Sequence, residues 1–263
     1  MNIFMTGSGG YIGRGVAAKL LQEGHTVIDF CRSMRRPYAS VSLEVPLQTI
    51  HTNIDGTASL LEAARLSGIR RVVLYSSDAA YGEHGSTPIS LTTPLFPRTP
   101  YGVTKAAVEM LGRAYNYSFG MECVSLRVGM VYGGDQITAN WVKSAVEAAV
   151  RNEPYLLEHG GDQTLEMVHI EDAVYCSCAA LTAEKINQLA VYNVVSHCVT
   201  LKAALAEIKR QIPQFEYQAG DGVITEAQGV WDIEDTVRGL GYHPKYTLEE
   251  GLSKYIDFMR GNI

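Results

Sequence analysis

The sequence has 263 residues, which suits one large domain or a core domain with a smaller lobe. It is 46% hydrophobic and 19% charged, so it can bury a core and is not disordered. A formal net charge of −6 argues against a nucleic-acid partner, and no apolar run approaches the roughly 20 residues of a membrane span. Residues 1–10 do not read as a signal peptide, and five scattered cysteines predict reduced thiols in the cytoplasm and no metal site.

The predicted elements alternate along the chain. Apolar runs predict strands at residues 2–5, 25–31, 71–75 and 122–128, and helical patterns cover residues 11–22, 53–67, 101–119, 140–151 and 248–259. Buried strands separated by helices indicate an α/β fold with a doubly wound parallel sheet of the Rossmann type. The expected division is a dinucleotide-binding domain over 1–135, to which 168–195 return, and a smaller substrate lobe over 136–167 and 196–263.

A glycine-rich segment, TGSGGYIG, follows the first predicted strand. Gly7, Gly10 and Gly13 would allow a sharp turn, a close backbone approach to a pyrophosphate and tight packing of helix on strand. The phosphates would then meet free N–H groups at the start of the helix, where Tyr11 and Ile12 lie. The position of these glycines predicts a dinucleotide cofactor.

The end of the second predicted strand bears on which cofactor binds. An acid commonly holds the ribose hydroxyls of NAD there, but this chain has Cys31, followed by Arg32, Ser33 and Arg36. Guanidinium groups suit a 2′-phosphate, so the sequence favours NADP over NAD. Two alternatives stay open: the arginines could form a solvated loop, and Asp29 could be the missing acid.

Three residues further along form the candidate catalytic site. Ser77 ends a buried strand at the carboxyl edge of the sheet, where ligands bind in such folds. Tyr101 and Lys105 are four residues apart in the segment YGVTK and therefore share a helix face. The ammonium would lower the pKa of the phenol, which could then exchange a proton with a substrate hydroxyl while a nicotinamide exchanges hydride.

These segments resemble one family in order along the chain: TGSGGYIG, NIDGTASLLEAAR, VVLYSSDAAYG, YGVTK, SLRVGMVYGG, MVHIEDAV and LGYHPKYTLEEGL. The chain resembles the extended short-chain dehydrogenases/reductases, or NAD-dependent epimerase/dehydratase family. The resemblance implies that Tyr101 is the acid/base, that Lys105 also binds the nicotinamide ribose, and that Ser77 polarises the substrate oxygen. It also implies a homodimer that pairs the helices at 53–67 and 101–119. His169 and Asp172, like Asn53, are interpreted as structural residues.

The chain departs from the family between the second strand and NIDGT. Only about twenty residues lie there, too few for the strand, helix and strand that the family has. A true deletion would leave a slot in the sheet centre with costly unpaired backbone groups. Either the sheet is rearranged, or residues are omitted from the sequence within 34–42; we favour the second.

Smaller departures bear on the substrate. Asp78 is followed by Ala79, so half of the acidic pair of family dehydratases is absent. Met130 replaces a common asparagine, and the stretch QTLEM at 163–167 lacks the arginine that often binds a diphosphate, whereas Arg127 could be structural. These differences make nucleotide sugars less expected than usual in the family.

The sequence thus predicts an NAD(P)-dependent oxidoreductase that acts on a hydroxyl or carbonyl of a small sugar, polyol or related metabolite. One alternative is a sugar or nucleotide-sugar epimerase with tightly bound NAD. Another is a non-catalytic dinucleotide-binding sensor, against which the presence of Ser77, Tyr101 and Lys105 argues. The specific substrate cannot be read from the sequence.

Overall fold

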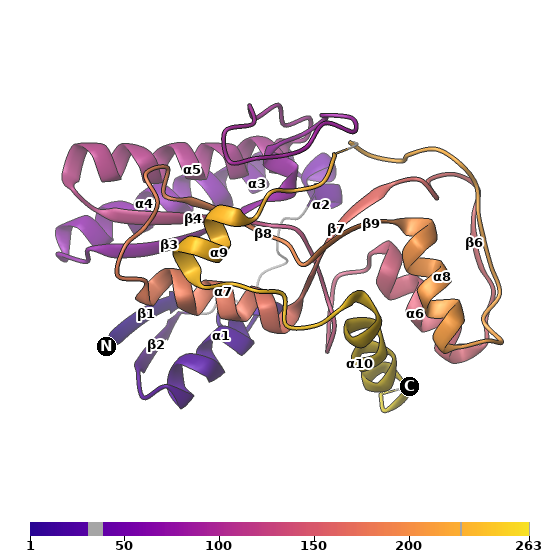
Figure 1. Ribbon diagram of the computed structural model, residues 1–263. Helices are drawn as coiled ribbons and strands as arrows, with labels where there is room; N and C mark the ends of the chain where they lie inside the picture. The colour runs from indigo at the N-terminus through magenta and orange to yellow at the C-terminus, as the bar shows by residue number, and fades with distance from the viewer. Residues whose placement is uncertain (31–38, 227, 263) are drawn as a thin grey trace.

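The computed structural model describes residues 1–30, 39–226 and 228–262 (Figure 1). Its strands are β1 (Asn2–Thr6), β2 (Thr26–Phe30), β3 (Arg71–Ser77), β4 (Glu122–Val128), β5 (Met130–Tyr132), β6 (Tyr155–Leu157), β7 (Thr164–His169), β8 (Val191–Val194), β9 (His197–Thr200) and β10 (Tyr217–Ala219). Its α-helices are α1 (Tyr11–Gln22), α2 (Ala39–Glu44), α3 (Pro46–Ile50), α4 (Gly56–Leu66), α5 (Pro100–Phe119), α6 (Trp141–Arg151), α7 (Ile170–Thr182), α8 (Leu201–Gln211), α9 (Glu234–Leu240) and α10 (Leu248–Arg260). A π-helix, η1 (His51–Asp55), precedes α4, and a 3₁₀-helix, η2 (Asp78–Ala80), follows β3.

These elements agree with the main sequence predictions. The predicted helix over 11–22 and the predicted strand over 122–128 have the same bounds in the structure. The helix predicted over 53–67 differs, because its first turn belongs to η1, and π-helical turns are rare and are often found at functional sites. No helix among the described residues is long and apolar enough to span a membrane.

The central sheet has the order β3-β4-β8 and is parallel throughout. Helices α4 and α5 lie on one side of it and α7 on the other (Figure 1). On the first side, Leu61 of α4 packs in a cluster with Cys123 of β4. On the second side, Cys176 of α7 packs with Leu126 of β4 and Tyr192 of β8. Both faces of the strands are therefore buried, which explains their nearly continuous apolar sequences.

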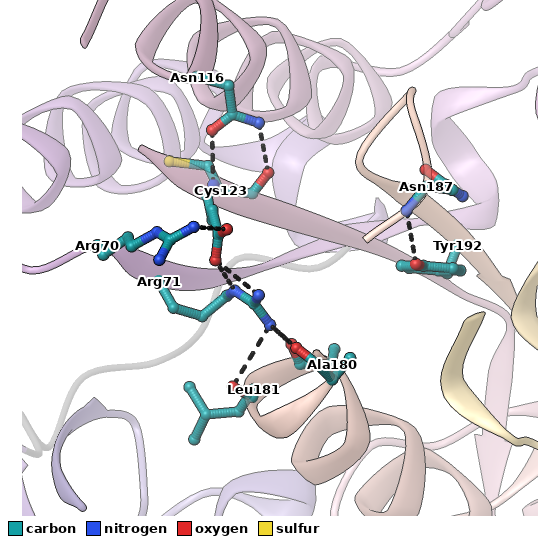
Figure 2. A network of polar contacts seen from close by, with 10 residues as sticks. Arg70, Arg71, Asn116, Cys123, Ala180, Leu181, Asn187 and Tyr192 are labelled. Carbon is teal, nitrogen blue, oxygen red and sulfur yellow. Dashed lines mark hydrogen bonds and ion pairs between the residues drawn. The ribbon is translucent and has the colours of Figure 1, made fainter. Parts of the chain in front are cut away.

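A polar network fastens the amino-terminal edge of this sheet (Figure 2). The Arg71 guanidinium donates to the Glu122 carboxylate at 2.8 Å and to the carbonyl of Ala180 at 2.9 Å, near the end of α7. The Asn116 side chain of α5 donates to the carbonyl of Cys123 at 2.9 Å and accepts from its N–H at 2.6 Å. One strand edge is thus tied to the helices on both faces of the sheet.

The first two strands form a separate parallel pair, β1-β2. Helix α1 links this pair to the remainder of the domain, because Val16 and Leu20 of α1 pack against Val174 and Cys178 of α7. Gly15 makes this contact close: a Cβ atom there would lie 2.5 Å from a methyl group of Val174. The β1-β2 pair is therefore joined to the rest of the domain through the packing of α1 on α7.

Among the described residues, no strand joins β1 to β3. The parallel sheet of the described residues is therefore in two pieces, at the place where a true deletion would leave a slot. Helices α2 and α3 occupy part of that segment and contact α5. Residues 31–38 lie outside the described part of the chain, so the choice between a rearranged sheet and omitted residues within 34–42 stays a prediction.

The C-terminal lobe has its own core. Strands β5 and β7 pair in parallel, β7 and β9 pair antiparallel, and β6 pairs with β10. Helices α6, α8 and α10 pack together beside them (Figure 1). This core includes buried aromatic and aliphatic side chains: Tyr132, Leu165, Met167, Leu205, Phe215, Leu252 and Tyr255. The sequence boundaries proposed for the two parts stay an interpretation, since β7 belongs to the lobe sheet and leads directly into α7.

Candidate active site

The start of α5 lies against the end of β3. Thr99 caps the helix by accepting a hydrogen bond from the Gly102 N–H at 3.1 Å, and Pro100 occupies the first turn, where its missing N–H costs nothing. A Cβ atom on Gly102 would lie 2.3 Å from the carbonyl oxygen of Ala79. Only glycine allows this approach, which places Tyr101 beside the residues that follow β3.

Ser77 lies at the carboxyl edge of the sheet, paired with Val128 of β4, and it is 6% exposed. Its hydroxyl donates a hydrogen bond to the Asp78 carboxylate. That carboxylate also accepts from the Ala79 N–H at 2.8 Å. Burial raises the pKa of Asp78, while these two hydrogen bonds oppose the rise. The proton of Ser77 therefore points to Asp78 in this structure.

Tyr101 is half-buried next to this pair. Burial raises the pKa of Tyr101 to about 12, the charge of Asp78 adds to the rise, and a hydrogen bond with Ser77 opposes it. The prediction of a lowered pKa is therefore wrong for this structure. The physical reason is that desolvation and a neighbouring carboxylate both disfavour the phenolate.

Lys105 is also half-buried, one helical turn after Tyr101. Its ammonium lies 5.4 Å from the centroid of the Tyr101 ring and donates a hydrogen bond to the Tyr75 carbonyl at 2.7 Å. Burial lowers the pKa of Lys105 to about 8, so the group is mostly charged at neutral pH. The structure thus brings together the three residues that the sequence selected, with a protonated phenol, a serine hydroxyl and an ammonium on adjoining elements.

The glycine segment has the geometry of a dinucleotide loop. Gly7 adopts a left-handed conformation with φ of 74°, and a Cβ atom on Gly13 would lie 2.1 Å from the Gly7 carbonyl oxygen. Helix α1 begins at Tyr11 after Gly10, whose position carries no side-chain cap. Its first N–H groups can therefore meet an anion. These residues fit a dinucleotide pyrophosphate.

The residues that were predicted to select between NAD and NADP are only partly described by the structure. Arg32, Ser33 and Arg36, on which the preference for NADP rested, lie outside the described residues. Asp29, the alternative acid, is on β2 and accepts a hydrogen bond from the Ser8 hydroxyl of the glycine loop. A carboxylate therefore adjoins the glycine loop.

Residues interpreted as structural make structural contacts. Asp172 accepts hydrogen bonds from the Ser196 hydroxyl at 2.8 Å and from the Lys245 N–H at 3.1 Å. His169 caps α7 by accepting from the Glu171 N–H, and burial lowers the pKa of His169 to about 4.

Asn53 and Arg127, which the sequence suggests are structural, also have internal partners. The Asn53 amide donates to the Thr104 hydroxyl at 2.9 Å, which ties η1 to α5. Arg127 forms a buried ion pair with Glu109 at 2.7 Å and donates to the Tyr81 hydroxyl. The structural interpretation of both residues is supported by these contacts.

Sequence reasoning missed three residues around the site. Ser42 of α2 accepts a hydrogen bond from the Tyr101 N–H at 3.2 Å. Gln228 donates from its side chain to the Asp78 carbonyl at 3.2 Å, and Glu166 of β7 is a buried carboxyl group. A glutamate in a strand with buried neighbours is the one signal that could have been read, since buried acids are rare without a specific reason.

A family model for the NAD dependent epimerase/dehydratase family matches residues 36–194. The chain belongs to this family. The match starts after the glycine loop. The assignment of that loop as a dinucleotide site therefore rests on its own geometry, described above. The predicted family, the Rossmann-type α/β fold and the extended short-chain dehydrogenase/reductase class of enzyme are confirmed.

Curated relatives cover most of the chain. The low-salt glycan biosynthesis protein Agl12 of Haloferax volcanii is 27% identical over 218 residues, which cover 81% of this chain and 69% of that protein. A dTDP-glucose 4,6-dehydratase of Xanthomonas campestris pv. campestris is 26% identical, covering 99% of this chain and 80% of the relative. That alignment spans 287 positions, more than the 263 residues of this chain, so the relative has residues without a counterpart here.

Solved structures share the fold. The UDP-glucose 4-epimerase of Thermotoga maritima, in complex with UDP-glucose, has a TM-score of 0.88 and 23% identity and covers 100% of this chain and 99% of that chain. The UDP-glucuronic acid 4-epimerase of Bacillus cereus, in complex with UDP-glucuronic acid and NAD, has a TM-score of 0.86 and 23% identity, with complete coverage of both chains. At these identities the likeness concerns the fold.

Proposed function

We propose that the protein is an NAD-dependent epimerase of a nucleotide-bound sugar. The observation that carries the proposal is the junction of Tyr101, Ser77 and Lys105 at the carboxyl edge of the sheet, on a chain of the epimerase/dehydratase family. Relatives and structural neighbours named as nucleotide-sugar epimerases support this function better than net oxidation or reduction of a free sugar or polyol, which the sequence favoured.

In the proposed reaction, bound NAD would supply reversible hydride transfer at a sugar carbon, and the configuration of that carbon would be inverted. The glycine loop and the start of α1 would hold its pyrophosphate. Lys105 would bind the nicotinamide ribose, and its charge would stabilise a phenolate forming at Tyr101. Tyr101 would take the proton of the sugar hydroxyl and give it back, and Ser77 would donate a hydrogen bond to the same oxygen.

NAD is the proposed cofactor in place of NADP. Asp29 adjoins the glycine loop through Ser8, and a carboxylate suits ribose hydroxyls and repels a 2′-phosphate. Thermal unfolding with each cofactor tests this choice, because a ligand that binds the folded state raises the midpoint. A larger rise with NADP, lost in the Arg32→Ala variant, would restore the original preference.

The residues that departed from nucleotide-sugar enzymes have internal partners in the structure. The Gln163 side chain accepts hydrogen bonds at 3.0 Å from the N–H groups of Ile224 and Thr225, so it fastens the segment before Gln228. Met130 packs against the lobe core. These positions therefore shape the lobe, and any contact to a diphosphate would come from other residues.

The test uses purified protein with NAD and a panel of UDP- and dTDP-sugars. Epimer formation without accumulation of reduced nicotinamide is the expected result, whereas steady accumulation would indicate net dehydrogenation. Tyr101→Phe should lower kcat by about 10²–10⁴, because it removes the acid/base and keeps the ring. Tyr117→Phe is the matched control, since Tyr117 lies on the same helix and is 95% exposed. Wild-type turnover by Tyr101→Phe would contradict the proposal.

A further inference from the structure

Tyr11 makes a side-chain contact that cofactor binding at its backbone does not explain. Its N–H is one of the groups that would meet a pyrophosphate at the start of α1, but its phenol donates a hydrogen bond to the carbonyl of Gly133. Gly133 directly follows β5 of the lobe sheet. Burial raises the pKa of the Tyr11 phenol, so this group stays protonated and remains a donor at neutral pH. The first residue of α1 thus holds the chain at the point where it leaves the lobe sheet.

An ion pair three residues further along α1 joins the same two parts of the chain. The Arg14 guanidinium lies 2.5 Å from the Asp135 carboxylate, and the two side chains are 47% and 55% exposed. An ion pair this exposed contributes little to stability, because water and salt screen the charges. The partly buried hydrogen bond of Tyr11 is therefore the stronger of the two contacts.

The start of α7 also contacts Gly133. The φ of Gly133 is 105°, a region that favours glycine, and an added Cβ atom would lie 2.9 Å from Nε2 of His169. His169 caps α7, and α7 packs on α1 through Val174 and Val16. Because both helices that contact Gly133 also pack on each other, the Gly133 carbonyl has a fixed place relative to the start of α1.

Three residues after Gly133 the chain reaches the helices of the lobe. Gln136 is 7% exposed, and the Tyr255 hydroxyl of α10 donates to its side-chain oxygen at 3.3 Å. The Lys143 ammonium of α6 donates to the Gln136 carbonyl at 2.7 Å. We call residues 133–136 the connecting segment, because it contacts α1 at one end and the lobe helices at the other. Four residues span at most about 14 Å, so a restraint on one end limits the position of the other.

We propose that the Tyr11 side chain couples cofactor binding at the start of α1 to the position of the substrate lobe. An anion on the first N–H groups of α1 would restrain Tyr11, and the phenol would pass that restraint through Gly133 and Gln136 to α6 and α10. Tyr11 is then a positioning residue that acts through the connecting segment. This role rests on the proposed function. The coupling is reciprocal, so a substrate that orders the lobe tightens NAD binding by the same factor.

The first test uses the protein without ligands. Tyr11→Phe keeps the ring and every backbone N–H of the glycine loop and removes only the hydroxyl. Amide hydrogen exchange across residues 130–136 should become about tenfold faster, because the segment loses a hydrogen bond that holds it to α1. Tyr175→Phe is the matched control, since the Tyr175 phenol likewise donates to a backbone carbonyl, that of Gly241 at 3.1 Å. Unchanged exchange across 130–136 in Tyr11→Phe would overturn the proposal.

The second test adds NAD to the same proteins. In the wild type and in Tyr175→Phe, NAD should slow exchange across residues 7–13 and also across 130–136. In Tyr11→Phe it should slow exchange across 7–13 alone. Protection limited to 7–13 in the wild type, or equal protection of 130–136 in Tyr11→Phe, would overturn the coupling and leave the cofactor site in place. Protection of neither segment in the wild type would overturn the proposed cofactor site, and the coupling with it.

The third test measures the coupling itself, with UDP-glucose as the probe. By calorimetry, UDP-glucose should tighten NAD binding at least about fivefold in the wild type and in Tyr175→Phe, and less than about twofold in Tyr11→Phe. In turnover, Tyr11→Phe should raise KM for UDP-glucose more than it lowers kcat, because the hydroxyl positions the lobe and does not touch the reacting atoms. The same tightening factor in Tyr11→Phe and wild type, or a loss confined to kcat, would refute the coupling.

Discussion

Replacing Lys105 with methionine should make the protein more stable while it removes activity. Burial lowers the pKa of Lys105 from 10.5 to about 8. Each pKa unit corresponds to about 1.4 kcal/mol, so keeping the ammonium charged at neutral pH costs the folded state roughly 3 kcal/mol. Solvent screening at this half-buried position reduces that cost. The variant also loses the hydrogen bond to the Tyr75 carbonyl, which lowers its stability by about 1 kcal/mol. The net gain should be about 1–2 kcal/mol.

The gain should depend on pH in one direction. The folded protein loses the Lys105 proton near pH 8 and the unfolded chain near 10.5, so between these values the unfolded state binds more protons. The stability of the wild type therefore rises relative to that of Lys105→Met across this window. The difference between the two proteins should be largest at pH 7 and should close as the pH approaches 10.5.

Urea unfolding at pH 7 and pH 10, followed by tryptophan fluorescence, measures this difference. Lys185→Met, at an exposed position, is the control for the general effect of removing a lysine. The reasoning is refuted if Lys105→Met is less stable than wild type at pH 7, or if its advantage is the same at both pH values. Loss of epimerase turnover in the same variant would show that the protein needs the Lys105 ammonium for activity, although this charge lowers its stability.

Three other outcomes are expected. Gly13→Ala should weaken NAD binding at least about tenfold by calorimetry, because the methyl group has no room beside the Gly7 carbonyl; unchanged affinity would exclude the loop as the cofactor site. Arg71→Met should lower the free energy of unfolding by about 2–3 kcal/mol in urea, since it leaves carbonyls of α7 without their donor and leaves Glu122 with Arg70 alone; a loss below about 0.5 kcal/mol would contradict this. The protein should sediment as a homodimer at micromolar concentration, and Met110→Glu, at a position 60% exposed on α5, should make it monomeric; a monomeric wild type would reject the dimer.

Local patterns in the sequence determined the elements and the chemistry. The glycine spacing of residues 7–13 predicts both the turn and the start of α1, because Gly7 adopts a left-handed conformation and Gly13 leaves no room for a Cβ atom beside the Gly7 carbonyl. The four-residue spacing of Tyr101 and Lys105 predicts a shared helix face, since helix geometry is local. Ser77 could be placed at the sheet edge because strand ends follow from the apolar run. The shortened segment before Asn53 left two alternatives open, a rearranged sheet or residues omitted within 34–42, and the second stays the favoured prediction.

Only the tertiary structure decided the electrostatics of the site and the contacts between distant parts of the chain. The sequence gives no measure of burial, so it could not show that desolvation and the charge of Asp78 raise the pKa of Tyr101. Nor could it place Glu166 against Gly129, because that contact depends on how β7 pairs beyond the end of β4. Spacing along a helix is fixed by the chain itself, whereas the energy of a charge depends on everything that the fold packs around it.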